Sequence, residues 1–110
     1  MNWFSKILGG GDRAAAEPWP EEALIVDVRS PGEFQSGHVE GALNLPLNEL
    51  PRLAGSQLPD KGRPLVLYCQ SGMRSESARQ YLQSCGYTGL FNGRSPGAVA
   101  LRLQRPIVRN

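Results

Sequence analysis

The chain has 110 residues, enough for one domain and too few for two domains of ordinary size. Its formal net charge is +2, and its 12 Lys and Arg residues form no basic cluster, which argues against nucleic-acid binding. The two cysteines are too few for a disulfide-stapled secreted domain and lack zinc-site spacing, so the expected compartment is the reducing cytoplasm.

Residues 1–20 are predicted to form an amino-terminal segment and a linker, and residues 21–110 a single domain. The segment Met1–Leu8 places four apolar residues on one face of a short helix. Polar residues interrupt it too early for a signal peptide or a membrane span. We expect it to dock on its own domain, with docking on a membrane or a partner as the alternative. Gly9–Pro20 has the composition of a linker.

Strand and helix patterns alternate after the linker. Short apolar runs predict four strands, at residues 24–28, 42–45, 65–68 and 90–91. Helical patterns lie between and after them: a capped turn at 30–36, a weak helix at 47–58, an amphipathic helix at about 75–84 and a last helix opening at 95–96. This order predicts an α/β fold with a central, mostly parallel sheet and helices on both faces.

Ligands of such sheets bind at the carboxyl ends of the strands. There, Cys69 opens a loop that leads from the clearest strand into the amphipathic helix, and the loop continues through Gln70, Ser71, Gly72, Met73, Arg74 and Ser75. Free N–H groups and the dipole at the start of a helix favour an anion. We therefore predict a lowered pKa for Cys69 and a nucleophilic thiolate.

Two further residues of the loop support this interpretation. Gly72 allows the loop to curl so that successive N–H groups face the sulfur, and Arg74 adds a permanent positive charge. The simpler interpretation makes Cys69 one more buried apolar residue, but the combination of strand, Cys, Gly, Arg and helix disfavours it. Four residues separate Cys69 from Arg74, one fewer than in phosphatase-type loops, and the tighter cup suits a single extra sulfur atom.

The chain resembles the rhodanese family in two segments. Residues 27–46 are similar to the amino-terminal signature of the family, and residues 69–75 to its active-site loop. The resemblance implies a single-domain thiosulfate sulfurtransferase, in which the Cys69 thiolate takes a sulfur from thiosulfate or a persulfide donor. The N–H groups of residues 70–74 would hold the resulting persulfide. Its sulfur would pass to a thiophile, which is cyanide in vitro and a thiol or a protein in the cell, without any metal or cofactor.

Other titratable residues are assigned supporting roles. We expect Asp27, Arg29 and Glu33 to brace the cleft, with Arg29 and Glu33 close enough in sequence to pair across the capped turn. The only histidine, His38, is expected to be structural. Cys85 lies on the apolar stripe of the amphipathic helix and is expected in the core, with a role as resolving thiol as the alternative.

The carboxyl-terminal part departs from the family pattern. Arg94 stands where the second glycine of a Gly-Gly pair is usual, and no Trp follows. Arg94 is therefore a candidate second cation for an anionic donor. Two other function classes stay open: a non-catalytic binding module with the rhodanese fold, and a small Cys-dependent phosphatase or arsenate reductase. The intact loop disfavours the first class, and the length of the loop disfavours the second.

Overall fold

The computed structural model describes residues 18–109. The segment Met1–Leu8 lies outside the described residues, and the predicted domain boundary at residue 21 stays a prediction. The elements in chain order are β1 Leu24–Asp27, α2 Pro31–Ser36, β2 His38–Val39, β3 Leu43–Asn44, η1 Leu47–Glu49, α3 Leu50–Gln57, β4 Leu65–Tyr68, α4 Met73–Ser84, β5 Leu90–Arg94, α5 Pro96–Leu103 and β6 Ile107–Val108.

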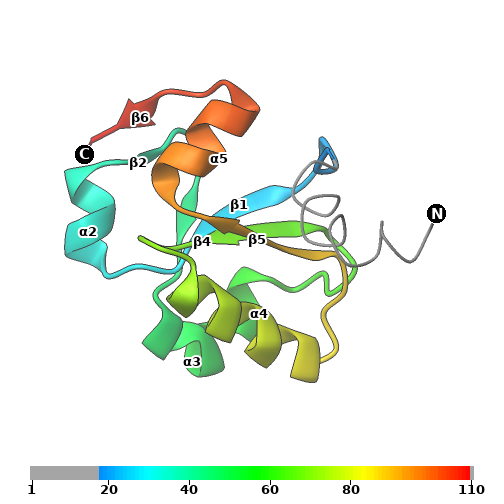
Figure 1. The fold of residues 1–110 in the computed structure, drawn as a ribbon. Helices are drawn as coiled ribbons and strands as arrows, with labels where there is room; N and C mark the ends of the chain where they lie inside the picture. Colours follow the sequence, from blue (N-terminus) through cyan, green and yellow to red (C-terminus); the bar gives the residue numbers. More distant parts are fainter. Residues whose placement is uncertain (1–17, 110) are drawn as a thin grey trace, which may run out of the picture.

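The centre of the fold is a four-stranded parallel sheet in the order β3-β1-β4-β5. Helices α3 and α4 cover one face of this sheet, and α5 covers the other (Figure 1). The predicted fold class is thus confirmed. Within residues 18–109, no helix combines the length and the apolar character that a membrane crossing requires.

The predicted elements differ from the observed ones mainly at their ends. Strand β4 has the predicted bounds, whereas α4 begins two residues earlier, at Met73, and β5 extends to Arg94. The weak helix at 47–58 divides into η1 and α3, with Pro51 in the first turn of α3, where its missing N–H leaves no internal bond unmade. A second sheet, the antiparallel pair β2–β6, was not predicted, because two-residue strands carry no readable periodicity.

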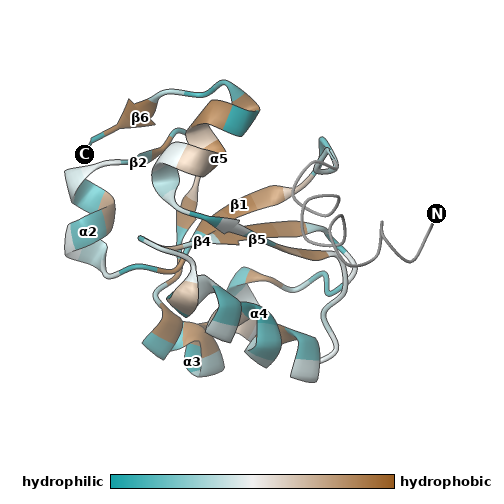
Figure 2. Cartoon of the chain, in the orientation of Figure 1, coloured by the Kyte–Doolittle hydropathy of each residue, from teal (hydrophilic) through white to brown (hydrophobic). Residues whose placement is uncertain are grey.

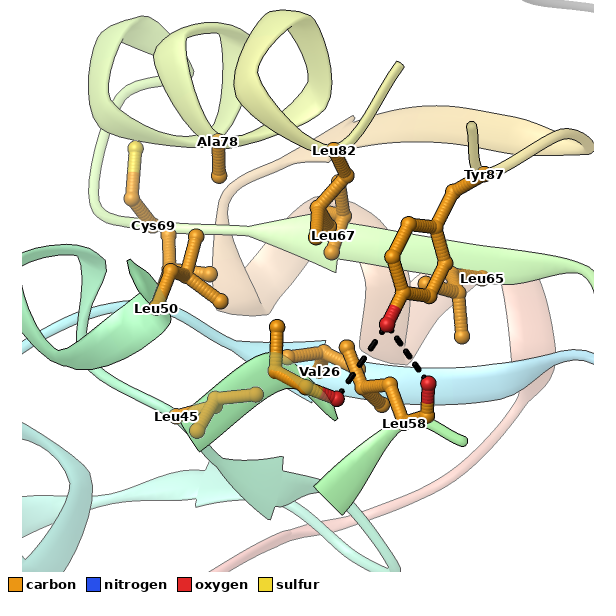
Figure 3. Packing of buried hydrophobic residues seen from close by; sticks show 12 residues of the cluster. Val26, Leu45, Leu50, Leu58, Leu65, Leu67, Cys69, Ala78, Leu82 and Tyr87 are labelled. Carbon is orange, nitrogen blue, oxygen red and sulfur yellow. Dashed lines mark hydrogen bonds between the residues drawn. The ribbon is translucent and has the colours of Figure 1, made fainter. Parts of the chain in front are cut away.

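Side chains that alternate along the strands build a core on each face of the sheet. On the α3–α4 side, Val26, Leu65 and Leu67 pack with Leu50 and Leu82 of the helices (Figure 3). On the α5 side, a smaller cluster contains Ile25, Val39, Val66, Tyr68 and Val99. The strands are therefore apolar on both faces, while polar residues dominate the outer surface of α4 (Figure 2).

The parallel register brings three strand ends to one edge of the sheet. Asp27 at the end of β1 lies beside Tyr68 at the end of β4, and Tyr68 lies beside Arg94 of β5. The segments that follow β1 and β4 therefore leave the sheet side by side. This edge carries the residues that the sequence selects for chemistry.

We predict that Gly93→Ala destabilises the fold by about 1–3 kcal/mol. A Cβ atom at this position would lie 2.5 Å from Val99 Cγ2 and 2.9 Å from Val66 Cγ1, both of them buried valines. Chemical denaturation gives the free energy of unfolding. The control is Gly97→Ala in α5, where a Cβ meets no atom within 4 Å and the variant should be as stable as the parent chain or more so. Equal stability of the two variants would contradict the prediction.

Candidate active site

The Cys69 sulfur lies beneath the loop that joins β4 to α4, and its side chain points toward the amino end of that helix (Figure 3). The residue is only 1% exposed and its neighbours include core residues of the α3–α4 side. Its sulfur nevertheless has polar partners. The Gly72 amide donates to Sγ at 3.0 Å, and the Ser75 hydroxyl oxygen lies 3.5 Å from Sγ.

These partners favour the thiolate. Burial alone raises the pKa of Cys69, but hydrogen bonding with the Ser75 hydroxyl and with the backbone amides of Ser75, Gly72 and Ser71 outweighs it, so the pKa lies below its ordinary value. Two of these amides, those of Ser71 and Gly72, belong to the residues 70–74 that were expected to hold the sulfur. The third, that of Ser75, lies one residue beyond them.

Gly72 gives the loop its shape. It is the N-cap residue of α4 and has a left-handed conformation with φ 108°, which favours glycine over any other residue. This conformation turns its N–H toward the sulfur. The side chains of Gln70, Ser71 and Met73 lie on the outside of the loop, with Met73 79% exposed.

Asp27 and Arg29 form a buried ion pair next to the loop. The Asp27 carboxylate accepts from the Arg29 amide at 2.9 Å, from Nε at 3.0 Å and from Nη2 at 2.7 Å, and neither residue is more than 4% exposed. Arg29 also donates to the Gly37 carbonyl at 2.7 Å and reaches Gln70 Oε1 at 3.5 Å. The predicted Arg29–Glu33 pair was wrong, because the fork of Arg29 is occupied by Asp27.

Glu33 instead pairs with Arg74 across 41 residues of sequence. The pair is bidentate, with Nη1–Oε1 at 2.8 Å and Nη2–Oε2 at 2.9 Å. Hydrogen bonds from Arg74, followed by the Ser30 amide, lower the pKa of Glu33 to about 2. Ser30 and Glu33 form the capping box predicted at the start of α2. The first turn of α2 therefore also holds Arg74 of the active-site loop.

Arg94 lies directly against the loop. Its carbonyl accepts from the Cys69 amide at 3.1 Å, and its Cβ and Cγ lie 3.7 and 3.6 Å from where a Gly72 Cβ would be. The residue has φ 78°, a strained conformation for arginine. Within residues 18–109 its guanidinium makes no ion pair or hydrogen bond.

The sequence analysis missed Asn92. Its side chain accepts from the Ser75 hydroxyl at 2.7 Å and donates to the Gly72 carbonyl at 3.1 Å. The signal that could have found it is its place near the carboxyl end of a strand, next to the one that carries Cys69.

Two other predicted residues lie apart from the sulfur. His38 is buried, stacks on Phe34 with ring centroids 3.6 Å apart, and contacts the Phe34 carbonyl through Nδ1 at 2.8 Å, as expected of a structural residue. Cys85 caps the far end of α4, a helix of 12 residues. At 1.5 Å per residue, roughly 18 Å separates the two ends, too far for a disulfide with Cys69 in this conformation.

Cavity size does not identify this site. A hollow of about 650 Å³ lies by the other ends of the strands, where Leu24, Pro64 and Arg105 are among its lining residues, and none of the residues around Cys69 lines it. Within residues 18–109, no group of three or more His, Cys, Asp or Glu side chains is arranged to hold a metal ion.

Comparison with known proteins gives consistent matches. The family model for the rhodanese-like domain matches residues 5–94. The thiosulfate sulfurtransferase PspE of Escherichia coli is 38% identical over 78 residues, which are 71% of this chain and 69% of PspE. A sulfurtransferase of Allochromatium vinosum is 40% identical over 88 residues, 80% of each chain. A solved structure described as a rhodanese with anions from E. coli has a TM-score of 0.72 and 33% identity, and the match covers 80% of this chain and 99% of that one.

We predict that Asp27→Asn destabilises the fold by about 3 kcal/mol, because it leaves the buried Arg29 cation without a counter-ion. The measurement is the free energy of unfolding from denaturant titration. Glu49→Gln is the matched control: it removes an ion pair whose arginine, Arg52, is 72% exposed, and should change stability by less than about 1 kcal/mol. Similar losses in the two variants would show that burial of the Asp27–Arg29 pair is unimportant.

Proposed function

The chain belongs to the rhodanese-like domain family, and from this membership we propose that it is a thiosulfate sulfurtransferase with Cys69 as the nucleophile. The observation that carries the proposal is the hydrogen bond from the Gly72 amide to the Cys69 sulfur, together with the lowered pKa of that thiol. A thiolate is the reactive form of cysteine, and here backbone dipoles rather than a general base favour it.

The first half-reaction transfers sulfur to the enzyme. The Cys69 thiolate attacks the outer sulfur of thiosulfate with its electron pair and forms a new S–S bond. The original sulfur–sulfur bond of thiosulfate breaks, and sulfite leaves with that electron pair. Arg74 supplies positive charge at the mouth of the loop for the anionic donor, and Glu33 holds this guanidinium in place.

The second half-reaction returns the enzyme to its starting state. A thiophile, either cyanide or a thiol, attacks the outer sulfur of the Cys69 persulfide, and the S–S bond to Sγ breaks with its electrons returning to the cysteine. The amides of Ser71, Gly72 and Ser75 favour the thiolate, and we expect them to stabilise the persulfide anion in the same way. Neither half-reaction needs an external oxidant or reductant.

Intact-mass spectrometry after incubation with thiosulfate tests this proposal. We expect the parent chain and Cys85→Ser to gain the mass of one sulfur atom and to lose it again on addition of cyanide, with formation of thiocyanate. Cys69→Ser should gain nothing. A folded parent chain that remains unmodified in the absence of reducing agent would refute sulfur transfer at this site.

We also propose that Arg94 is a second cation for the anionic donor. It adjoins Gly72, is exposed, and has a guanidinium that pairs with no carboxylate among the described residues. The strained backbone at this position favours glycine, and an arginine held there is an observed outlier that fits a functional role.

For Arg94→Gly we predict opposite effects on stability and on donor affinity. Release of the strain at φ 78° should stabilise the fold by about 1 kcal/mol. Loss of the charge should raise KM for thiosulfate roughly two- to fivefold, a difference of 1 kcal/mol or less. Unfolding and steady-state kinetics measure the two effects.

Gln104→Gly is the matched control, because Gln104 is the other non-glycine residue with positive φ in residues 18–109. It should gain stability in the same way with KM unchanged. If KM is unaltered in Arg94→Gly, Arg94 has no role in donor binding.

A further inference from the structure

One polar side chain that contacts Ser75, the neighbour of the sulfur, has no part in the mechanism above. Asn92 lies in β5, and its side-chain amide bonds to four residues. Its Oδ1 accepts from the Ser75 hydroxyl at 2.7 Å and from the Arg94 amide at 2.9 Å. Its Nδ2 donates to the Gly72 carbonyl at 3.1 Å and, at 3.4 Å, to a carboxylate oxygen of Glu76. Asn92 therefore joins β5 to the middle of the 69–75 loop, at Gly72, and to its carboxyl end, at Ser75.

The hydroxyl of Ser75 has a single hydrogen to share between two neighbours. In the structure it donates to Asn92 Oδ1, while its oxygen lies 3.5 Å from Cys69 Sγ. A neutral thiol can donate its own hydrogen to that oxygen, which gives the chain Cys69 to Ser75 to Asn92. A thiolate or a persulfide anion has no hydrogen to give, so the hydroxyl must turn toward the sulfur.

The hydrogen bond from the Arg94 amide to Asn92 Oδ1 lowers the free-energy cost of this rotation of the Ser75 hydroxyl. When the hydroxyl rotates away, Oδ1 still accepts from the Arg94 amide and so keeps a hydrogen-bond partner. Ser75 is fully buried, and so the hydroxyl depends on its protein partners for its orientation. The bond from Nδ2 to the Gly72 carbonyl holds the glycine whose N–H faces the sulfur.

We propose that Asn92 is a positioning residue for sulfur transfer, which holds the Ser75 hydroxyl ready to donate to an anionic sulfur on Cys69 and keeps the Gly72 amide facing that sulfur. The proposal rests on the proposed function, because it concerns the same nucleophile. It assigns to β5 a direct part in the chemistry of the loop that follows β4.

The test is the pH dependence of the alkylation rate of Cys69 by iodoacetamide, measured in a Cys85→Ser background so that a single thiol reacts. We expect Ser75→Ala to raise the pH midpoint by about one unit, the effect of losing one hydrogen bond to a charged group. Asn92→Ala should raise it as well, because the Ser75 hydroxyl and the Gly72 amide lose the side chain that positions them. In the double variant the rise should be smaller than the sum of the two single rises, because part of the effect of Asn92 passes through Ser75.

Asn44→Ala is the matched control. Asn44 is also an asparagine near the end of a strand of the same sheet, and its Nδ2 donates to the carbonyls of Asp27 and Arg29 without contacting the cysteine. It should lose stability and keep the alkylation midpoint of the parent. The charged groups near the Cys69–Ser75–Asn92 cluster are kept in all these variants: Asp27, Arg29, Glu33, Arg74, Glu76 and Arg94.

Three results would overturn the proposal. These are a parent-like midpoint in folded Asn92→Ala, a parent-like midpoint in Ser75→Ala, and full additivity in the double variant. A parent-like midpoint in Ser75→Ala would overturn the proposal even if Asn92→Ala fails to fold. Alkylation involves no sulfur donor, so a parent chain that fails to load sulfur would refute the proposed function without changing this result.

Discussion

The interaction on which the site depends is the hydrogen bond between the Gly72 amide and the Cys69 sulfur. An isolated anion in the interior is strongly disfavoured, and Cys69 lies among core residues with 1% of its surface exposed. The amides of the loop and the Ser75 hydroxyl replace the water that the thiolate would otherwise need. The loop amides are fixed before any donor binds, which is how a preorganised site stabilises charge with little rearrangement.

The rest of the fold holds this loop in place from three sides. From β1, the buried Asp27–Arg29 pair reaches the loop through Gln70. From α2, Glu33 holds Arg74. From β5, Arg94 and Asn92 bond to the backbone at Cys69 and Gly72. Each contact joins residues far apart in sequence, and the parallel register of the sheet brings them to one edge.

Local signals were sufficient to predict much of this architecture. The four-residue apolar run of β4, the capping box at Ser30 and the cysteine at the end of a strand followed directly from the sequence. Long-range pairings did not. No spacing rule links Glu33 to Arg74. The i, i+4 rule favoured Arg29 as the partner of Glu33, whereas in the structure Arg29 pairs with the buried Asp27. Asn92 was missed because its place near the carboxyl end of a strand points to the site only once that strand is known to lie beside β4.

The most direct test of the account is a titration of Cys69 itself. The ultraviolet absorbance of the thiolate, followed against pH in the Cys85→Ser variant, reports when this one sulfur becomes an anion. The account predicts a midpoint below that of an ordinary cysteine, because the surrounding donors outweigh burial. A midpoint at or above the ordinary value would mean that burial dominates, and it would contradict the view that the loop stabilises an anionic sulfur.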